Sequence, residues 1–315
     1  MSDKILIVGA GAIGGFYGSL LAKAGAEVSV VCRSDYQIVK QLGFQIDSFS
    51  LGQWQFQPHQ VLRHAGDYQD QADYLILCSK VTAQIDRVAM IRDAVRKNTV
   101  IVFIQNGVEI EAELQAAFPD NVLISGLAFI CCNRLAAGKI THLAYGKLTL
   151  GDVPSGVSAQ TLHLQQLFLQ ANIECEVSKD IIASRWQKCV WNAPFNPLSV
   201  LSGGLPTLAI LQNQIGLVRR IMQEVCDIAA GCGHTLPDDI IETNIQNTFA
   251  MPPYKTSMLL DFERQHAMET EAILGNAVRA ADRENIDCPT LRTVYALMQL
   301  RELQLHAESL EKIAT

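Results

Sequence analysis

The sequence Lys4-Ile5-Leu6-Ile7-Val8, followed at once by Gly9-Ala10-Gly11-Ala12-Ile13-Gly14, decides the fold. A short apolar run that ends in glycine is typical of a buried parallel strand. A helical pattern then extends to Gly25, and residues 27–32 predict a second strand. Strand, glycine loop, helix and strand within about 30 residues are the pattern of a dinucleotide-binding βαβ unit. We therefore predict an N-terminal Rossmann-type domain.

Each glycine of this loop has a separate physical task. The first allows a tight turn, the second lets the backbone approach a pyrophosphate, and the third lets the helix pack closely on the strand. The helix N-terminus then offers free N–H groups and the positive end of a dipole to phosphate. We expect a dinucleotide here, in preference to a purely structural turn, bound by Gly9, Ala10, Gly11, Ala12, Ile13 and Gly14.

The end of the second strand selects the cofactor. An NAD site usually has a carboxylate there to accept a hydrogen bond from the ribose 2′-OH. Here the residues are Cys32-Arg33-Ser34. Arg33 can stack on adenine and pair with a 2′-phosphate, and Ser34 can donate to that phosphate. The pattern favours NADP, although Asp35 is close enough in the sequence to weaken the argument.

Two further apolar runs lead into polar residues. Residues 73–78 are followed by Lys80, and residues 99–104 are followed by Asn106. Ligands of open α/β sheets bind outside the carboxyl ends of the strands. Lys80 and Asn106 are therefore candidate cofactor-binding residues, the alternatives being a solvated lysine and a turn amide. Residues 81–95, between the two strands, predict a helical crossover.

The remaining patterns change character at Ser178. Before it we expect a hairpin (44–61), further strands (122–151), an amphipathic helix (158–171) and a last strand (173–177). After it the chain is helical, with breaks at 197–206, 231–237, 252–253 and 288–289. These patterns predict an α/β chain with a doubly wound Rossmann domain at residues 1–178 and an all-helical domain at residues 179–315. We expect a substrate between the two domains.

Lys188, Asn192 and Asn196 are spaced four residues apart in an otherwise apolar and aromatic segment. On a helix this spacing places them along one face, with a drift of about 40° per step. Polar groups among apolar neighbours are costly to maintain. One interpretation is a surface lysine and helix-ending asparagines beside Pro194 and Pro197. The other is a proton donor with amides that fix a small polar ligand.

A second polar group follows Pro252-Pro253. Thr256 and Ser257 are each suited to cap a helix that begins there. Glu269 has apolar residues at helical spacing around it, so its side chain can face inward. Periodicity does not separate Glu269 from Glu271, and an exposed helix carboxylate is the alternative for both.

Composition excludes several classes of protein. A net charge of −7 argues against a nucleic-acid groove or an anionic membrane surface. No apolar run approaches the roughly 20 residues that span a bilayer. Nine cysteines without a CxxC pair fit free thiols in a reducing compartment, so we expect a cytoplasmic protein without a bound metal. Cys131-Cys132 is better explained as two strand residues than as a redox pair.

With these residues considered, the sequence resembles the ketopantoate reductase family (2-dehydropantoate 2-reductases) over essentially its whole length. The resemblance lies in the N-terminal glycine loop, in Gln105-Asn106-Gly107, in the Lys188, Asn192, Asn196-Pro197 series, in Ser257-Met258-Leu259 and in residues 285–290. It implies that Lys188 is the catalytic proton donor, that Ser257 binds the substrate and that Glu269, twelve positions later, is the active-site glutamate.

Two departures concern the substrate side of the family pattern. Tyr254 occupies a position where the family often has asparagine, and another asparagine is missing near Leu205-Pro206-Thr207. The reaction type is unaffected by these changes. The identity of the 2-keto acid is what they leave open.

The resemblance implies NADPH-dependent reduction of 2-dehydropantoate to pantoate, a step of pantothenate biosynthesis. Lys188 would stabilise the growing oxyanion and deliver the proton, while Asn192, Asn196 and Ser257 hold the substrate and Asn106 holds the nicotinamide ribose. The alternatives are a dehydrogenase for another 2-keto acid or an opine, and a non-catalytic NADPH-binding sensor. The partner is a small molecule, and the helical half is compatible with a homodimer or a monomer.

Overall fold

The computed structural model describes residues 2–251 and 255–314, with side chains described as far as residue 305. Pro252, Pro253 and Tyr254 lie outside the described residues. The chain divides into two compact units. Unit 1 contains residues 1–80, 85–105 and 111–181, and unit 2 contains residues 81–84, 106–110 and 182–315.

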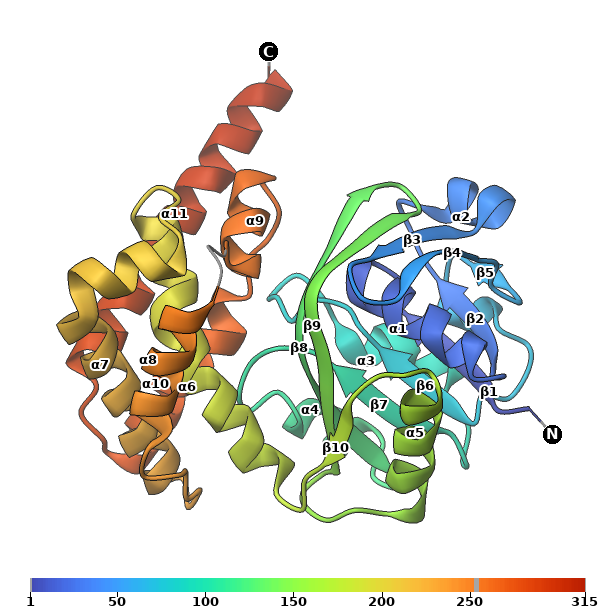
Figure 1. Cartoon of the computed structure of the whole chain (residues 1–315), viewed down its shortest axis with the longest axis horizontal. Helices are drawn as coiled ribbons and strands as arrows, with labels where there is room; N and C mark the ends of the chain where they lie inside the picture. The colour runs from blue at the N-terminus through green and yellow to red at the C-terminus, as the bar shows by residue number, and fades with distance from the viewer. Residues whose placement is uncertain (1, 252–254, 315) are drawn as a thin grey trace. The chain divides into compact units, whose positions relative to one another are not determined.

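Unit 1 is an α/β body built on one sheet (Figure 1). Its elements are β1 (Lys4–Val8), α1 (Ala12–Lys23), β2 (Glu27–Val31), α2 (Tyr36–Leu42), β3 (Phe44–Ser48), β4 (Gly52–Phe56), β5 (Val61–Leu62), η1 (Ala65–Asp67), β6 (Tyr74–Leu77), α3 (Arg87–Ile91), η2 (Arg92–Ala94), β7 (Val100–Ile104), α4 (Ala112–Ala117), β8 (Leu123–Ala136), β9 (Lys139–Asp152), α5 (Ala159–Gln170) and β10 (Cys175–Val177).

The sheet has the order β4-β3-β9-β8-β7-β6-β1-β2-β5, with β10 paired to β9. Within the run β8-β7-β6-β1-β2-β5, every strand pairs in parallel with the next. Strand β8 also pairs with β9, in a long antiparallel hairpin. Val8 is in register with Val31 of β2 and with Leu77 of β6, and Leu77 is in register with Phe103 of β7. The carboxyl ends of four central strands are therefore level. The predicted Rossmann-type sheet is confirmed.

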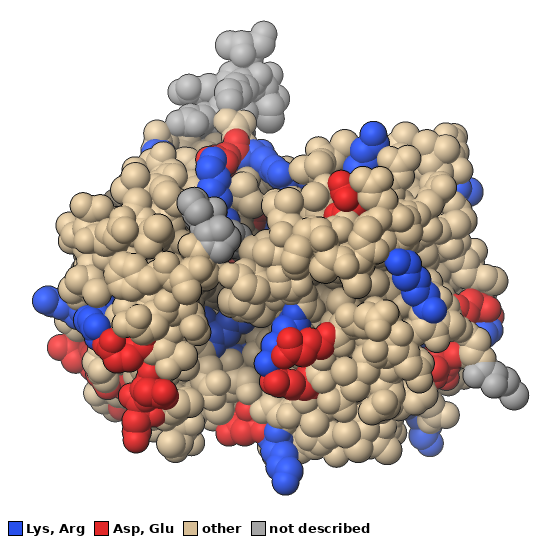
Figure 2. Space-filling view, in the orientation of Figure 1, with Lys and Arg blue, Asp and Glu red and all other residues tan. Residues whose placement is uncertain are grey.

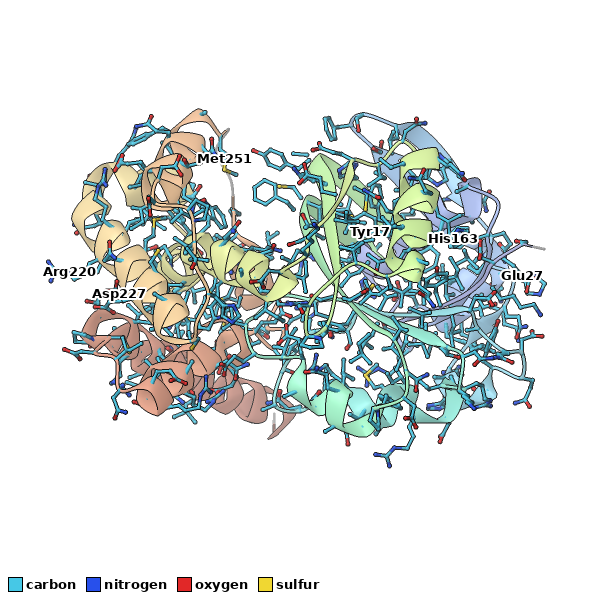
Figure 3. All side chains as sticks on the ribbon, turned by 90° about the horizontal axis from the view of Figure 1, so that it is seen from below. Tyr17, Glu27, His163, Arg220, Asp227 and Met251 are labelled. Carbon is cyan, nitrogen blue, oxygen red and sulfur yellow. The ribbon has the colours of Figure 1, made fainter. Side chains whose placement is uncertain are left out.

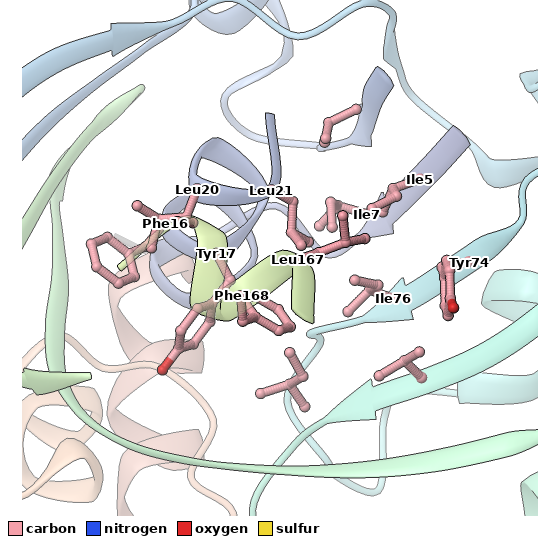
Figure 4. Packing of buried hydrophobic residues seen from close by; sticks show 14 of the residues in the cluster. Ile5, Ile7, Phe16, Tyr17, Leu20, Leu21, Tyr74, Ile76, Leu167 and Phe168 are labelled. Carbon is pink, nitrogen blue, oxygen red and sulfur yellow. The ribbon is translucent and has the colours of Figure 1, made fainter. Parts of the chain in front are cut away.

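The core of unit 1 lies between this sheet and helices α1 and α5 (Figure 4). Tyr17 of α1 and Phe168 of α5 pack edge to face, with ring centroids 5.7 Å apart. The Tyr17 hydroxyl is buried, and it donates to the Gly146 carbonyl at 3.1 Å. Figure 3 shows Tyr17 inside the unit and Glu27 at its periphery. Apolar packing from both helices thus holds the glycine loop, which joins β1 to α1.

Unit 2 is helical, apart from the short segments 81–84 and 106–110. Its elements are α6 (Ile181–Leu201), α7 (Thr207–Gly231), α8 (Ile240–Ala250), α9 (Ser257–Glu263), the π-helical turn η3 (Glu271–Gly275), α10 (Asn276–Glu284) and α11 (Pro289–Ala314). Trp186, Phe195 and Met222 are completely buried in its core. Arg220 and Asp227 project outward from α7 (Figure 3).

One local expectation was wrong, and two others differ from the structure in their bounds. Residues 81–86 are not helical, and the crossover before β7 contains only the short α3 and η2. The predicted break at 197–206 is present but covers only residues 202–206, since α6 continues through Pro194 and Pro197 to Leu201. The change from unit 1 to unit 2 falls between Ile181 and Ile182, three residues after the expected boundary at Ser178.

The surface supports the composition argument. On the face that Figure 2 shows, basic and acidic side chains are interspersed rather than gathered by sign. In the described ranges, no helix combines the length and the apolar character that a bilayer span requires.

Candidate active site

The glycine loop of unit 1 has the geometry that a pyrophosphate needs. Gly9 turns the chain at φ +88°, and a Cβ there would lie 2.7 Å from the Ser79 nitrogen. A Cβ on Gly14 would meet the Gly9 carbonyl oxygen at 2.7 Å, so this glycine lets α1 approach β1. A Cβ on Gly11 would meet nothing within 4 Å. That open space at the helix N-terminus fits a bound phosphate.

The residues after β2 leave one guanidinium available. Arg33 is exposed, and its side chain has no hydrogen bond or ion pair with any described residue. Asp35 is buried, and its carboxylate is occupied: Arg134 pairs with one oxygen, and the Gly138 N–H donates to the other at 3.0 Å. The Asp35 carboxylate therefore already has partners within the protein and is not available to a ribose hydroxyl. These residues fit NADP better than NAD.

Ser34 has hydrogen-bond partners within unit 1, and its expected contact with a 2′-phosphate stays a prediction. Its hydroxyl donates to Asp35 at 2.7 Å and accepts from Arg134 at 2.9 Å. This arrangement has no signature in the sequence, because Arg134 is about a hundred positions away on β8. Lys80, the last residue of unit 1 before residue 81, is partly buried three positions after β6. Its predicted role in cofactor binding stays a prediction.

Unit 2 brings Lys188, Asn106 and Glu269 into one chain of hydrogen bonds. The Lys188 Nζ donates to Asn106 Oδ1 at 2.8 Å. The Asn106 Nδ2 donates to Glu269 Oε2 at 3.1 Å, and the Val81 N–H donates to Glu269 Oε1 at 3.1 Å. Asn106 and Val81 follow strands β7 and β6 in the chain. Glu269 therefore holds both segments, and Asn106 fixes the lysine amine.

The environment of Lys188 lowers the pKa of its amine to about 8. Burial is the main cause, because it penalises the charged form, and the nearby charge of Arg185 acts in the same direction. Glu269 opposes both by favouring the ammonium. A lysine with a pKa near the working pH is suited to deliver a proton.

The turn that carries Asn106 is held from three sides. Arg185 of α6, only 1% exposed, donates to the Gly107 carbonyl at 3.0 Å. The Val108 N–H donates to the Ala272 carbonyl at 3.0 Å, and the Asn276 amide donates to the Val108 carbonyl at 2.7 Å. Arg185 was not among the predicted site residues. Its position one turn before Lys188 was the only signal for it.

The two asparagines of α6 are nearly buried but lack partners. Asn192 is 7% exposed and Asn196 is 2% exposed. Among the residues with described side chains, neither amide side chain has a hydrogen-bond partner. An amide removed from water without a partner costs free energy, so such a group is well placed to bind a polar ligand.

Ser257 is placed by its neighbour. Thr256, not Ser257, caps α9, because its hydroxyl oxygen accepts from the Leu259 N–H at 3.2 Å. The same hydroxyl shares a 2.7 Å hydrogen bond with Ser199, one turn after Asn196 on α6. Ser257 is exposed at the first position of α9, and no described residue bonds to its side chain. Thr256 and Ser199 thus bring Ser257 to the end of α6 that carries Asn196.

Glycine-loop geometry in one unit, and an amine held by an amide in the other, are the features of a nicotinamide-dependent oxidoreductase. Two family models match the chain: "Ketopantoate reductase PanE/ApbA" over residues 5–155 and its C-terminal counterpart over residues 180–302. The chain belongs to the ketopantoate reductase family, which uses NADPH.

Named relatives extend over nearly the whole chain. A 2-dehydropantoate 2-reductase of Nostoc sp. strain PCC 7120 is 34% identical, covering 93% of each chain. The crystal structure of 2-dehydropantoate 2-reductase from Methylococcus capsulatus is 55% identical with a TM-score of 0.92, covering 96% of this chain and 97% of that one. The enzyme of that name from Geobacter metallireducens GS-15 is 31% identical with a TM-score of 0.88, covering 94% and 99%.

Proposed function

We propose that this protein reduces 2-dehydropantoate to pantoate with NADPH, a step of pantothenate biosynthesis. The observation that carries the proposal is the Lys188–Asn106–Glu269 chain, with an amine pKa of about 8. Membership of the family and the names of the relatives support the substrate.

The contacts of the residues support the roles proposed for them. When bound, NADPH supplies a hydride to the keto carbon. Lys188, as an ammonium, stabilises the negative charge that grows on the keto oxygen and gives it a proton. Asn106 keeps the amine oriented through its 2.8 Å hydrogen bond. Glu269 is a positioning residue in this proposal, because its oxygens accept from Asn106 and Val81.

Substrate binding is proposed for Asn192, Asn196 and Ser257. The support is that two of these side chains are almost buried and that none of the three has a partner in the described part of the chain. A substrate carboxylate or hydroxyl would satisfy them. For the cofactor, the proposed ligands are the loop of residues 9–14 and Arg33, together with Lys80 and Asn106.

The proposal is tested by oxidation of NADPH with 2-dehydropantoate, compared with pyruvate and 2-ketoisovalerate, and repeated with NADH. We expect 2-dehydropantoate and NADPH to give the highest kcat/KM. A clear preference for another keto acid would favour the related-dehydrogenase alternative, and binding of NADPH without any turnover would favour the sensor.

Substitution Lys188→Ala tests the proton donor. We expect kcat to fall by at least about 100-fold, the usual size of a general-acid contribution, while the Kd for NADPH stays near the wild-type value. Turnover close to that of the wild type would exclude Lys188 as the acid. The matched control is Lys255→Ala, because Lys255 is exposed and pairs only with Glu263 among the described residues.

Location and assembly are proposed on separate grounds. All nine cysteines are free thiols, which supports a cytoplasmic protein. A homodimer is supported by three exposed leucines on α11, Leu297, Leu300 and Leu303, at a spacing of three residues. Light scattering of the purified protein distinguishes the dimer from the monomer.

A further inference from the structure

We propose that Arg63 is a second cation for the 2′-phosphate of NADPH, beside Arg33, and that it helps to set the preference for NADPH over NADH. This inference rests on the cofactor of the proposed function. It does not depend on which 2-keto acid is reduced.

Strand register places Arg63 at the adenosine end of the cofactor site. Strand β5 is parallel to β2, with Val31 opposite Leu62, and the Cys32 N–H donates to the Leu62 carbonyl at 3.0 Å. The next residues in this register are Cys32 and Arg63, on strands about 4.8 Å apart. Arg33 is the residue after Cys32 in the chain. The carboxyl end of the second strand is where a Rossmann domain recognises the ribose 2′ position.

A tyrosine ring holds the Arg63 side chain against the turn that contains Arg33. The guanidinium carbon of Arg63 lies 4.1 Å from the centroid of the Tyr36 ring, within the range of a cation–π contact. Tyr36 belongs to the same turn as Arg33, because the Tyr36 N–H donates to the Arg33 carbonyl at 3.4 Å. Lys40 adds a third cation, with its Nζ 3.1 Å from the Tyr36 hydroxyl.

The charges of this group are not neutralised within the described part of unit 1. Arg33 and Arg63 are both exposed, and neither has an ion pair with a described residue. The nearby carboxylate of Asp35 is taken by Arg134 and by the Gly138 N–H. Neighbouring guanidinium groups without a counter-ion repel each other. A phosphate with two negative charges relieves that repulsion and can accept hydrogen bonds from both.

The ordinary interpretation is a pair of solvated surface arginines. Solvated arginines need no fixed position, whereas Arg63 is held in place by a backbone register and an aromatic ring. Asp35, the acid closest to Arg33 in the sequence, is buried and paired with Arg134, so it is not available to neutralise them. The two interpretations predict different binding of adenosine phosphates.

Calorimetry of the full-length protein with 2′,5′-ADP and with 5′-AMP measures the 2′-phosphate contribution without catalysis. For Arg63→Ala we expect the Kd of 2′,5′-ADP to rise by about tenfold, the loss of one charge-assisted contact, and the Kd of 5′-AMP to stay the same. Arg63→Lys should recover part of the loss. Kinetic assays should show a matching fall in kcat/KM for NADPH and none for NADH.

Arg92→Ala is the matched control. Arg92 is an exposed arginine of η2 in the same unit, and its removal changes the net charge equally. An unchanged Kd of 2′,5′-ADP in Arg63→Ala, or an equal weakening of 5′-AMP, would overturn the inference. A wild-type protein that binds 2′,5′-ADP no better than 5′-AMP would instead overturn the NADPH assignment itself, so the two failures are distinguishable.

Discussion

Glu269 and Glu271 are two positions apart and have different surroundings. Glu269 accepts from Asn106 and from the Val81 N–H. Glu271 accepts from the Tyr295 hydroxyl at 2.6 Å and pairs with Arg279 at 2.8 Å. Of these two glutamates, only Glu269 is among the groups that act on the pKa of Lys188. The pair therefore offers a test of electrostatic control at the scale of one residue.

Substitution Glu269→Gln should shift the basic limb of the kcat profile to lower pH. The ammonium form of Lys188 is the active acid, so kcat falls as pH rises through its pKa of about 8. Glu269 raises that pKa, and its neutral replacement lowers it. The measurement is kcat against pH at saturating substrates. Glu271→Gln is the control and should leave the limb in place, whereas an unmoved limb in Glu269→Gln would show that Glu269 has no influence on the acid.

Sequence periodicity was sufficient for part of this site. It placed Lys188, Asn192 and Asn196 on one helix, and α6 contains all three. It could not find Arg185, whose partner is a backbone carbonyl about 80 positions away. Backbone acceptors carry no sequence signature, and pairs separated by such distances depend on tertiary packing.

The turn between β1 and α1 shows how one element divides its tasks. A Cβ on Gly14 would lie 2.7 Å from the Gly9 carbonyl oxygen and 2.9 Å from the Ile7 side chain. A Cβ on Gly11 would enter open space. Gly14 serves the packing of the helix on the strand, and Gly11 serves the ligand.

Alanine at each position should therefore fail in a different way. Gly14→Ala should lower the free energy of unfolding by about 1–3 kcal/mol, the usual cost of overpacking. Gly11→Ala should keep a melting temperature near that of the wild type while the Kd for NADPH rises by about tenfold or more. Thermal unfolding and a fluorescence titration with NADPH measure the two effects. Equal loss of stability in both variants would contradict this division.

Most elements could be predicted because their patterns are local. Strands β1, β2, β6 and β7 are short apolar runs, and α5 begins at a serine cap that accepts from the Thr161 N–H. The errors had tertiary causes. The sequence of residues 81–84 fits a helical pattern. In the structure, however, this segment belongs to unit 2, where the Val81 N–H donates to Glu269. Tertiary contacts of this kind readily override the local helix propensity of a segment.

At the scale of the molecule, the two units are interleaved along the chain. Segments 81–84 and 106–110 lie in the sequence of unit 1 but belong to unit 2. They supply the Val81 N–H to Glu269 and the Gly107 carbonyl to Arg185. A boundary at residue 178 therefore separates the sequence patterns but not the compact bodies.

A fragment of residues 179–315 should not fold cooperatively. It lacks the carbonyl that accepts from Arg185, a cation only 1% exposed, and the N–H groups that bond to Ala272 and Glu269. A buried cation that loses its acceptor is strongly destabilising. Circular dichroism during heating should show a broad change for the fragment and a sharp one for the full chain. A sharp transition of the fragment near the temperature of the full chain would contradict this expectation.

The engagement of Asp35 has a consequence for anyone who wishes to switch the coenzyme. An acid of the kind that NAD sites use is already present at this point of the fold, but Arg134 and the Gly138 N–H hold it. Redesign toward NADH would begin by removing the partners that hold the Asp35 carboxylate, rather than by introducing a new carboxylate. Arg134→Ala combined with the loss of Arg33 would be the first pair to make, and an unchanged kcat/KM for NADH would show that the carboxylate cannot be recruited.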